Sequence, residues 1–147
     1  VQKEVADRIL SPPGSSTYGA LTVGVQSVAR VSSVLKVPAS AFRPVPAVDS
    51  TVIRIQPLRP APLRVWEEKE LRVLTRIAFQ QRRKQFQGIL RNHPDTALSH
   101  DQIQALEEMT GFDLRNRPQE FPPEDFLRLA KALREVTGGN LAQPPDS

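Results

Sequence analysis

The residues best suited to chemistry in this chain surround Phe42, in the sequence Ala-Phe-Arg-Pro-Val-Pro at positions 41–46. Pro44 and Pro46 restrict their own φ angles and push the residues before them toward extended conformations, so this loop cannot be helical and loses little entropy on ordering. Phe42 therefore stands on a rigid support that leads into a strand. Such a ring can stack on a planar ligand such as a nucleobase. The local pattern also leaves open that Phe42 fills the core beneath the loop.

A second set of candidate residues is basic. The segment from Leu71 to Pro94 contains no acid, and its basic residues are Arg72, Arg76, Arg82, Arg83, Lys84 and Arg91. On a helical projection of about 100° per residue all of them except Arg82 fall in one arc, opposite an apolar arc. Arg72 and Arg76 are like charges at i,i+4, which oppose an isolated helix. The pattern favours a polyanionic partner over an ordinary solvated face.

Arg82 projects toward the apolar arc. Two roles stay open for it: an ion pair with an acid of the first part of the chain, or a direct contact with RNA. The projection treats the segment as one helix, and a break near Gln80 and Gln81 would divide it into two.

Composition limits the other chemistry. The chain has 147 residues, 39% of them hydrophobic, and a net charge of +4, which is typical of a soluble globular protein with a mild preference for polyanions. It has no cysteine, which excludes disulfides, thiolate zinc sites and cysteine nucleophiles. His93 and His100 have no acids at ligand spacing, so we predict no metal site. No apolar run is long enough to span a membrane, so we predict no membrane partner.

Residues 1–58 must position Phe42. Apolar spacing predicts a helix over 1–10 and a short helix from about Tyr18. Two strands, 31–37 and 51–55, are predicted to form an antiparallel pair at a sheet edge. Such a pair is marginal alone, and the chain begins inside an amphipathic pattern without a starting methionine. We therefore expect a fragment of a longer protein.

A proline-rich joint over 59–62 separates this part from a helical one over 63–137, followed by a flexible tail over 138–147. Helices are predicted at about 65–79, 80–92, 99–110 and 123–137. Ser99 and Gln102 form a capping-box pattern before the third of these helices, and Gly111 ends it. The basic residues are thus predicted to lie on the first two helices.

Five blocks, in order over about 1–135, resemble the ribosomal RNA adenine dimethyltransferases. They lie at 2–8, 18–26, 37–52, 78–84 and 117–120. The resemblance implies an α/β fold: the end of a Rossmann-like methyltransferase domain, with helices and a terminal antiparallel strand pair, and then a small all-α RNA-binding domain. It also implies a cytoplasmic enzyme that transfers methyl groups from S-adenosylmethionine to two adjacent adenines near the 3′ end of small-subunit rRNA. Its partners are that rRNA and the immature small ribosomal subunit.

By this resemblance the cofactor loop and the catalytic motif lie N-terminal to anything present here. No cofactor-binding residue is then expected in the chain, which alone is predicted to be inactive. Phe42 is expected to face the ring of the target adenine. The expected RNA contacts are Arg43, Arg72, Arg76, Arg82, Arg83, Lys84, Arg91 and Arg117.

The sequence departs from the family pattern at Phe86-Gln87-Gly88, where the family has an apolar residue, Arg and Asn, so one expected phosphate contact is missing. Two other functions stay open. One is a non-catalytic RNA-binding or ribosome-assembly module, and the other is an adenine methyltransferase that acts on large-subunit rRNA.

Overall fold

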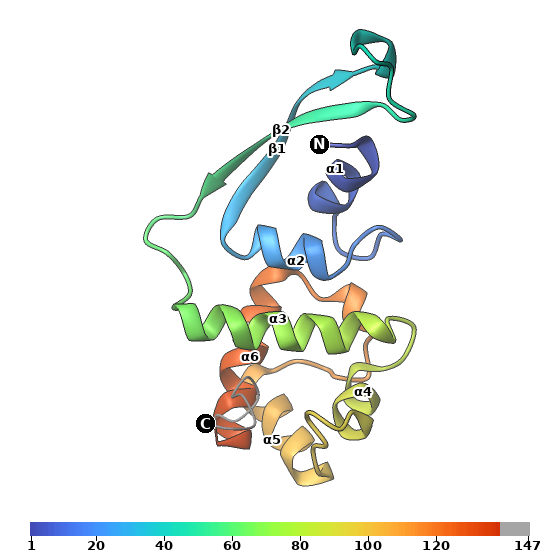
Figure 1. Cartoon of the computed structure of the whole chain (residues 1–147). Coiled ribbons are helices and arrows are strands. Elements are labelled where there is room, and N and C mark those ends of the chain that lie inside the picture. Colours follow the sequence, from blue (N-terminus) through green and yellow to red (C-terminus); the bar gives the residue numbers. More distant parts are fainter. Residues whose placement is uncertain (139–147) are drawn as a thin grey trace.

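The computed structural model describes residues 1–138 and has a mixed α/β fold (Figure 1). Its elements in chain order are α1 (Lys3–Leu10), α2 (Ala20–Gln26), β1 (Ala29–Val37), the 3-10 turn η1 (Ala39–Ala41), β2 (Ser50–Pro57), α3 (Val65–Gln80), α4 (Phe86–Asn92), α5 (His100–Thr110), the 3-10 turn η2 (Pro118–Glu120) and α6 (Pro123–Thr137). The strand hairpin and α1 form one end of the molecule, and α3 to α6 form the other. Helix α2 lies between them and contacts α1, α3 and α6.

The strands β1 and β2 pair antiparallel, which confirms the predicted arrangement. Val31 lies opposite Ile55, and the register shifts between Ser33 and Leu35, so Val34 has no partner. A bulge of this kind bends a strand and increases its twist. Helix α1 packs against both strands.

The first residues of the chain lie along the other edge of β2. Gln2 forms an isolated antiparallel bridge with Ser50. The Thr51 N–H donates to the Val1 carbonyl over 2.8 Å, and the terminal amine of Val1 donates to the Thr51 carbonyl over 3.1 Å. These bonds attach the start of β2 to the residues that lead into α1.

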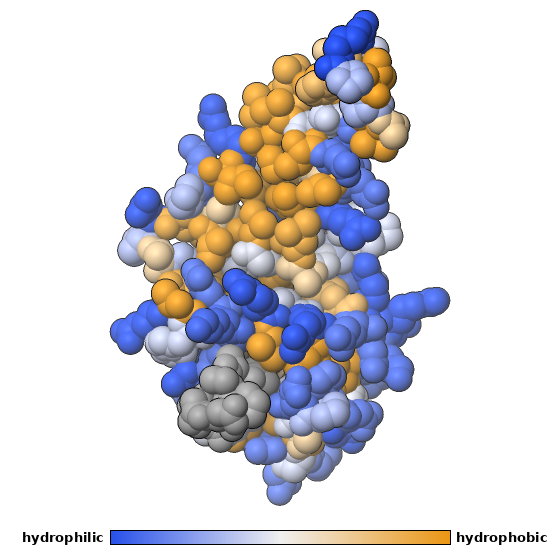
Figure 2. All heavy atoms as spheres, viewed as in Figure 1, coloured by the Kyte–Doolittle hydropathy of each residue, from blue (hydrophilic) through white to orange (hydrophobic). Residues whose placement is uncertain are grey.

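Large apolar side chains remain exposed on the hairpin. They include Val34, Leu35, Val52 and Ile55. Figure 2 shows hydrophobic residues gathered over the half of the molecule that contains β1 and β2. A two-stranded sheet that buries so little of its own apolar surface is marginal by itself. Its place is set by α1 and α2, which pack against it.

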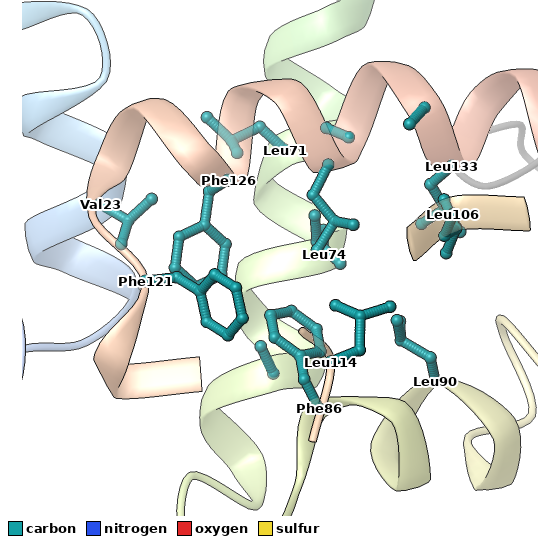
Figure 3. Close-up of a cluster of buried hydrophobic side chains, with 14 of the residues drawn as sticks. Val23, Leu71, Leu74, Phe86, Leu90, Leu106, Leu114, Phe121, Phe126 and Leu133 are labelled. Carbon is teal, nitrogen blue, oxygen red and sulfur yellow. The ribbon is translucent and has the colours of Figure 1, made fainter. Parts of the chain in front are cut away.

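The core lies among the helices (Figure 3). Leu74, Phe86 and Phe126 are fully buried there, and the rings of Phe86 and Phe121 meet edge to face with centroids 5.5 Å apart. Tyr18 and Val23 of the N-terminal part (residues 1–58) belong to the same cluster. One hydrophobic core therefore holds both sides of the proline-rich segment 59–62 together.

The predicted helix over 80–92 begins too early. Helix α3 continues to Gln80, Gln81 leaves the helical region with φ −134° and ψ 49°, and α4 begins only at Phe86. The first N–H groups of α4 are bound from outside the helix: the Phe86 N–H donates to the Asn116 carbonyl over 2.9 Å, and the Gln87 N–H to the Leu114 carbonyl over 2.7 Å. These partners, distant in sequence, fix where α4 starts. We call residues 81–85 the basic turn.

The predicted ends of α5 are confirmed. The Gln102 N–H donates to Ser99 Oγ over 3.1 Å, and the Ser99 N–H donates to Gln102 Oε1 over 2.9 Å. Gly111 ends α5 in the left-handed conformation, with φ 75°. Residues 139–147 of the predicted flexible tail lie outside the described residues. No helix within residues 1–138 combines the length and the apolar composition needed to cross a membrane.

Candidate nucleic-acid interface

Phe42 lies on the loop between β1 and β2, which we call the Phe42 loop (residues 38–49). It follows η1 with extended backbone angles, φ −108° and ψ 153°, and is 42% exposed. The alternative that Phe42 fills the core is therefore wrong. Asp49 ties the loop down at its base: Asp49 Oδ1 accepts the Ala39 N–H over 2.8 Å, and its carbonyl accepts the Lys3 N–H over 2.9 Å. An accessible ring thus stands on an anchored loop.

Arg43 braces the same loop. Its Nη1 donates to the carbonyl oxygens of Ser40 and Phe42, each over 2.9 Å. These bonds close the turn that carries the aromatic ring, and Arg43 itself remains exposed. Arg43 can meet a phosphate only with the donors that these carbonyls leave free.

The helical projection treated the segment as one helix, but the structure divides the other basic residues among three elements. Arg72 and Arg76 lie exposed on α3, Arg83 and Lys84 on the basic turn, and Arg91 in the last turn of α4. The break at Gln81 is the reason. Arg76 Nη2 lies 3.8 Å from Asp95 Oδ2, and both side chains are more than half exposed. An exposed pair of this kind is weak, so Arg76 remains available to another anion.

Arg117 is exposed at the start of η2. Its backbone N–H donates to Glu120 Oε2 over 2.7 Å. This bond fixes the backbone of Arg117 and leaves its side chain in solvent.

Arg82 behaves differently from its neighbours. It is only partly exposed, and its guanidinium reaches the α1–α2 loop (residues 11–19). Its hydrogen-bond acceptors are the carbonyl oxygens of Ser15, Ser16 and Tyr18 and the side-chain Oε1 of Gln119. Of the two roles left open for Arg82, the structure shows the contact with the first part of the chain. The expected acidic partner is wrong, because the acceptors are neutral oxygens.

The candidate residues lie in separate places. Figure 1 shows the Phe42 loop at the free end of the hairpin and the basic turn beside the helices, on the far side of α2. The fold therefore does not gather Phe42 and the basic residues into one pocket. A ligand that meets both must be extended.

The structure also contains a cleft between α2 and α3 that the sequence did not predict. It has a volume of about 550 Å³, and its walls are apolar, with Leu21, Val25 and Leu71 among them. Glu68, Arg72 and Arg76 also line it, so the charges around it are mixed. No local pattern predicts it, since its two walls are far apart in sequence and meet only when α2 packs on α3.

The described residues do not fit an S-adenosylmethionine site of the Rossmann type, which has a glycine-rich turn between a strand and the next helix. Strand β1 leads into η1 at Ala39, and β2 leads into the proline-rich segment 59–62. Within residues 1–138 no three His, Asp or Glu side chains are grouped so that they could hold a metal ion.

Comparison with known proteins relates the chain to one family of rRNA methyltransferases. A family model described as ribosomal RNA adenine dimethylase matches residues 1–135. The ribosomal RNA small subunit methyltransferase A of Idiomarina loihiensis is 37% identical over 147 residues, which is 100% of this chain and 48% of that protein. The protein of the same name from Parasynechococcus marenigrum is 43% identical over 137 residues, 92% of this chain and 44% of that protein. The chain thus spans about half the length of these relatives.

Solved structures agree on the fold. A dimethyladenosine transferase from Plasmodium falciparum superposes with a TM-score of 0.72 at 27% identity, over 92% of this chain and 56% of that one. The 23S rRNA methyltransferase ErmE superposes with a TM-score of 0.55 at 24% identity, over 90% of this chain and 52% of that one. At this identity the similarity supports the fold and nothing further. These neighbours are Rossmann-like methyltransferases, and the family match covers nearly the whole chain. The chain therefore belongs to the ribosomal RNA adenine dimethylase family.

Proposed function

We propose that this chain is the C-terminal part of an rRNA adenine N6-dimethyltransferase. The enzyme transfers methyl groups from S-adenosylmethionine to two adjacent adenines near the 3′ end of small-subunit rRNA, during assembly of the small ribosomal subunit in the cytoplasm. Membership of the ribosomal RNA adenine dimethylase family supports the reaction class. Relatives that carry the name small subunit methyltransferase support the substrate.

The observation that carries the proposal is the exposed ring of Phe42 on its braced loop. Asp49 and Arg43 hold the loop, so the ring needs little ordering when a base arrives. Stacking of one base on an aromatic side chain contributes about 1–3 kcal/mol. In this role Phe42 forms one wall of the pocket for the target adenine.

The basic residues serve a different part of the same RNA. Arg83 and Lys84 are exposed on the basic turn, and Arg72, Arg76, Arg91 and Arg117 are exposed on neighbouring elements. Arginine side chains grip phosphates through paired N–H donors. Their separation from Phe42 suits an extended ligand whose backbone lies along the helices while one adenine reaches the hairpin.

Residues 1–147 alone are expected to bind RNA without binding the methyl donor, because the described residues do not fit its site. Isothermal titration of S-adenosylmethionine into the chain should give no binding heat. Saturable binding would contradict this part of the proposal.

The role of Phe42 can be tested with an RNA hairpin that has two adjacent adenines, one of them replaced by 2-aminopurine. Stacking on an aromatic ring quenches the fluorescence of this base. We expect quenching with the wild-type chain and its loss with Phe42→Leu, which keeps an apolar side chain but removes the ring. Val45→Ala is a matched control, since Val45 is exposed on the same loop.

The possible outcomes separate the candidate functions. Equal quenching by wild type and Phe42→Leu would exclude Phe42 as the adenine wall. RNA binding without quenching by the wild type would favour a non-catalytic RNA-binding module. Tighter binding of a hairpin from large-subunit rRNA would favour the enzyme that acts on that subunit.

A further inference from the structure

Arg82 uses every nitrogen of its guanidinium within the molecule. Nη1 donates to the Ser16 carbonyl over 2.9 Å, and Nη2 donates to the carbonyls of Ser15 over 3.2 Å and Tyr18 over 2.9 Å. Nε and Nη2 both reach Gln119 Oε1, over 3.3 and 3.2 Å. Arg83 and Lys84 make no side-chain hydrogen bond or ion pair with any described residue and are exposed. Adjacent basic residues thus face in opposite directions.

The three carbonyls belong to the α1–α2 loop, which lies in the N-terminal part, whereas Arg82 and Gln119 belong to the helical part (residues 63–138). Gln119 contributes twice, because its carbonyl also accepts the Gly14 N–H over 2.7 Å. The α1–α2 loop is therefore bound both to the basic turn and to η2. We call these contacts of Arg82 and Gln119 with the α1–α2 loop the junction, and Arg82 is its charged residue.

We propose that Arg82 is a positioning residue rather than an RNA contact. It holds the α1–α2 loop, and through α1 the hairpin with Phe42, in a fixed orientation against the basic turn that carries Arg83 and Lys84. The proposal rests on the proposed function in one respect: the fixed orientation matters because one RNA must reach both Phe42 and the basic turn.

The chemistry of the side chain supports this role. A guanidinium has donors in a rigid planar fork and can bind several carbonyls that lie at different angles around it. A lysine ammonium has the same charge but concentrates its donors at one point, so it cannot replace all these bonds. A lysine can still bind a phosphate as a point charge, whereas these carbonyls at different angles require the fork.

The chain has no cysteine, so two introduced cysteines can be labelled with nitroxides without background. We would place them at Ser32 on β1 and Glu108 on α5, which are exposed and belong to different parts. Pulsed electron paramagnetic resonance then gives the distribution of distances between the parts. The same variants are titrated with small-subunit rRNA hairpins at several salt concentrations.

We expect Arg82→Lys to widen the distance distribution and to weaken RNA binding several-fold without changing its salt slope. Arg83→Lys, the matched control, should leave the distribution narrow. Arg83→Gln should also leave it narrow but reduce the salt slope by about one unit, as for the loss of one phosphate contact. A narrow distribution in Arg82→Lys, with a reduced salt slope in Arg82→Gln, would overturn the proposal and assign Arg82 to RNA.

Two further results keep the test decisive. If Arg82→Lys does not fold, Gln119→Met removes one acceptor of the same junction while keeping a similar shape, and it should widen the distribution in the same sense. An unchanged distribution in Gln119→Met would then count against the junction. If neither the wild-type chain nor any variant binds RNA, the proposed function is wrong. The distance measurement still decides whether Arg82 holds the two parts together.

Discussion

The hydroxyl of Tyr18 donates a 2.5 Å hydrogen bond to the carbonyl oxygen of Phe121, which follows it by 103 residues. Both residues are buried in the core. Tyr18 stands just before α2, and Phe121 lies between η2 and α6. This bond and the contacts of Arg82 both attach the α1–α2 loop to the helical part, the first through a buried neutral pair and the second through a partly exposed charge.

Tyr18 should make the chain sensitive to alkali. Burial, and secondarily the charges of Glu124 and Asp125, raise the pKa of the Tyr18 phenol above its ordinary value of 10.0. A group whose pKa is raised in the folded state stabilises the fold below its unfolded pKa, and this contribution is lost as the pH rises past that value. Tyr18 is the single tyrosine, so phenolate absorbance reports on it alone. We expect the absorbance to rise only together with loss of helical circular dichroism.

The control is Tyr18→Phe, which lacks the titrating group. It should lose about 1–3 kcal/mol of unfolding free energy at neutral pH, because a buried carbonyl is left without its donor. Its unfolding free energy should then decline less steeply above pH 10 than that of the wild type. A phenolate signal near pH 10 in a chain with full helical content would show that the phenol is not protected.

The pair of Glu70 and Arg134 predicts that the unfolding free energy depends on pH in the acidic range. Arg134 Nη1 lies 2.7 Å from Glu70 Oε1, and its guanidinium carbon lies 3.9 Å from the ring centroid of Trp66. Burial raises the pKa of Glu70 above its ordinary value of 4.5, although the charge and hydrogen bond of Arg134 act in the other direction. The folded chain then keeps this proton at pH values where the unfolded chain has lost it.

The contribution of Glu70 to stability should therefore be greatest below about pH 4.5 and decrease as the pH rises through that region. Urea unfolding of wild type and Glu70→Gln at about pH 4 and about pH 6 measures this. The difference between them should shift in favour of the variant as the pH increases. Glu108→Gln, at an exposed position on α5, should show no such shift. A shift in the opposite direction would mean that Arg134 outweighs burial.

The basic turn should determine the salt dependence of RNA binding. Each phosphate contact contributes about 0.7–0.9 to the slope of log K against log salt. Reversing both charges with Arg83→Glu and Lys84→Glu should thus reduce the magnitude of the slope by at least about 1.4. The matched control reverses Lys3 and Arg8, which lie on α1 in exposed ion pairs with Asp7 and Glu4. An unchanged slope in the variant of the basic turn would remove these residues from the interface.

Much of the local structure could be predicted from the sequence, because its causes are local. Ser99 and Gln102 are three residues apart and bind each other's backbone, so their pattern is sufficient to place the start of α5. The residue types between Val31 and Ile55 are typical of two strands, and they do pair. The exposure of Phe42 could not be predicted, since it depends on what lies beneath the loop.

The start of α4 shows why other features of the fold could not be predicted from the sequence. The sequence predicted that this helix begins at residue 80, but it begins at Phe86, where the N–H groups of Phe86 and Gln87 donate to the carbonyls of Asn116 and Leu114. A backbone carbonyl exists at every residue, so such a bond leaves no signature in the residue types.

By itself the sequence determined the type and order of the helices and strands, the family blocks, and the presence of a rigid aromatic and a cluster of basic residues. Only the tertiary structure decided that Phe42 is exposed and that Arg82 turns inward while Arg83 and Lys84 face solvent. The physical reason is that the apolar spacing that marks a helix or a strand repeats over a few residues of the chain. The direction of a charged side chain depends instead on which oxygen atoms the fold brings within reach, and for Arg82 these lie 37 to 67 residues away.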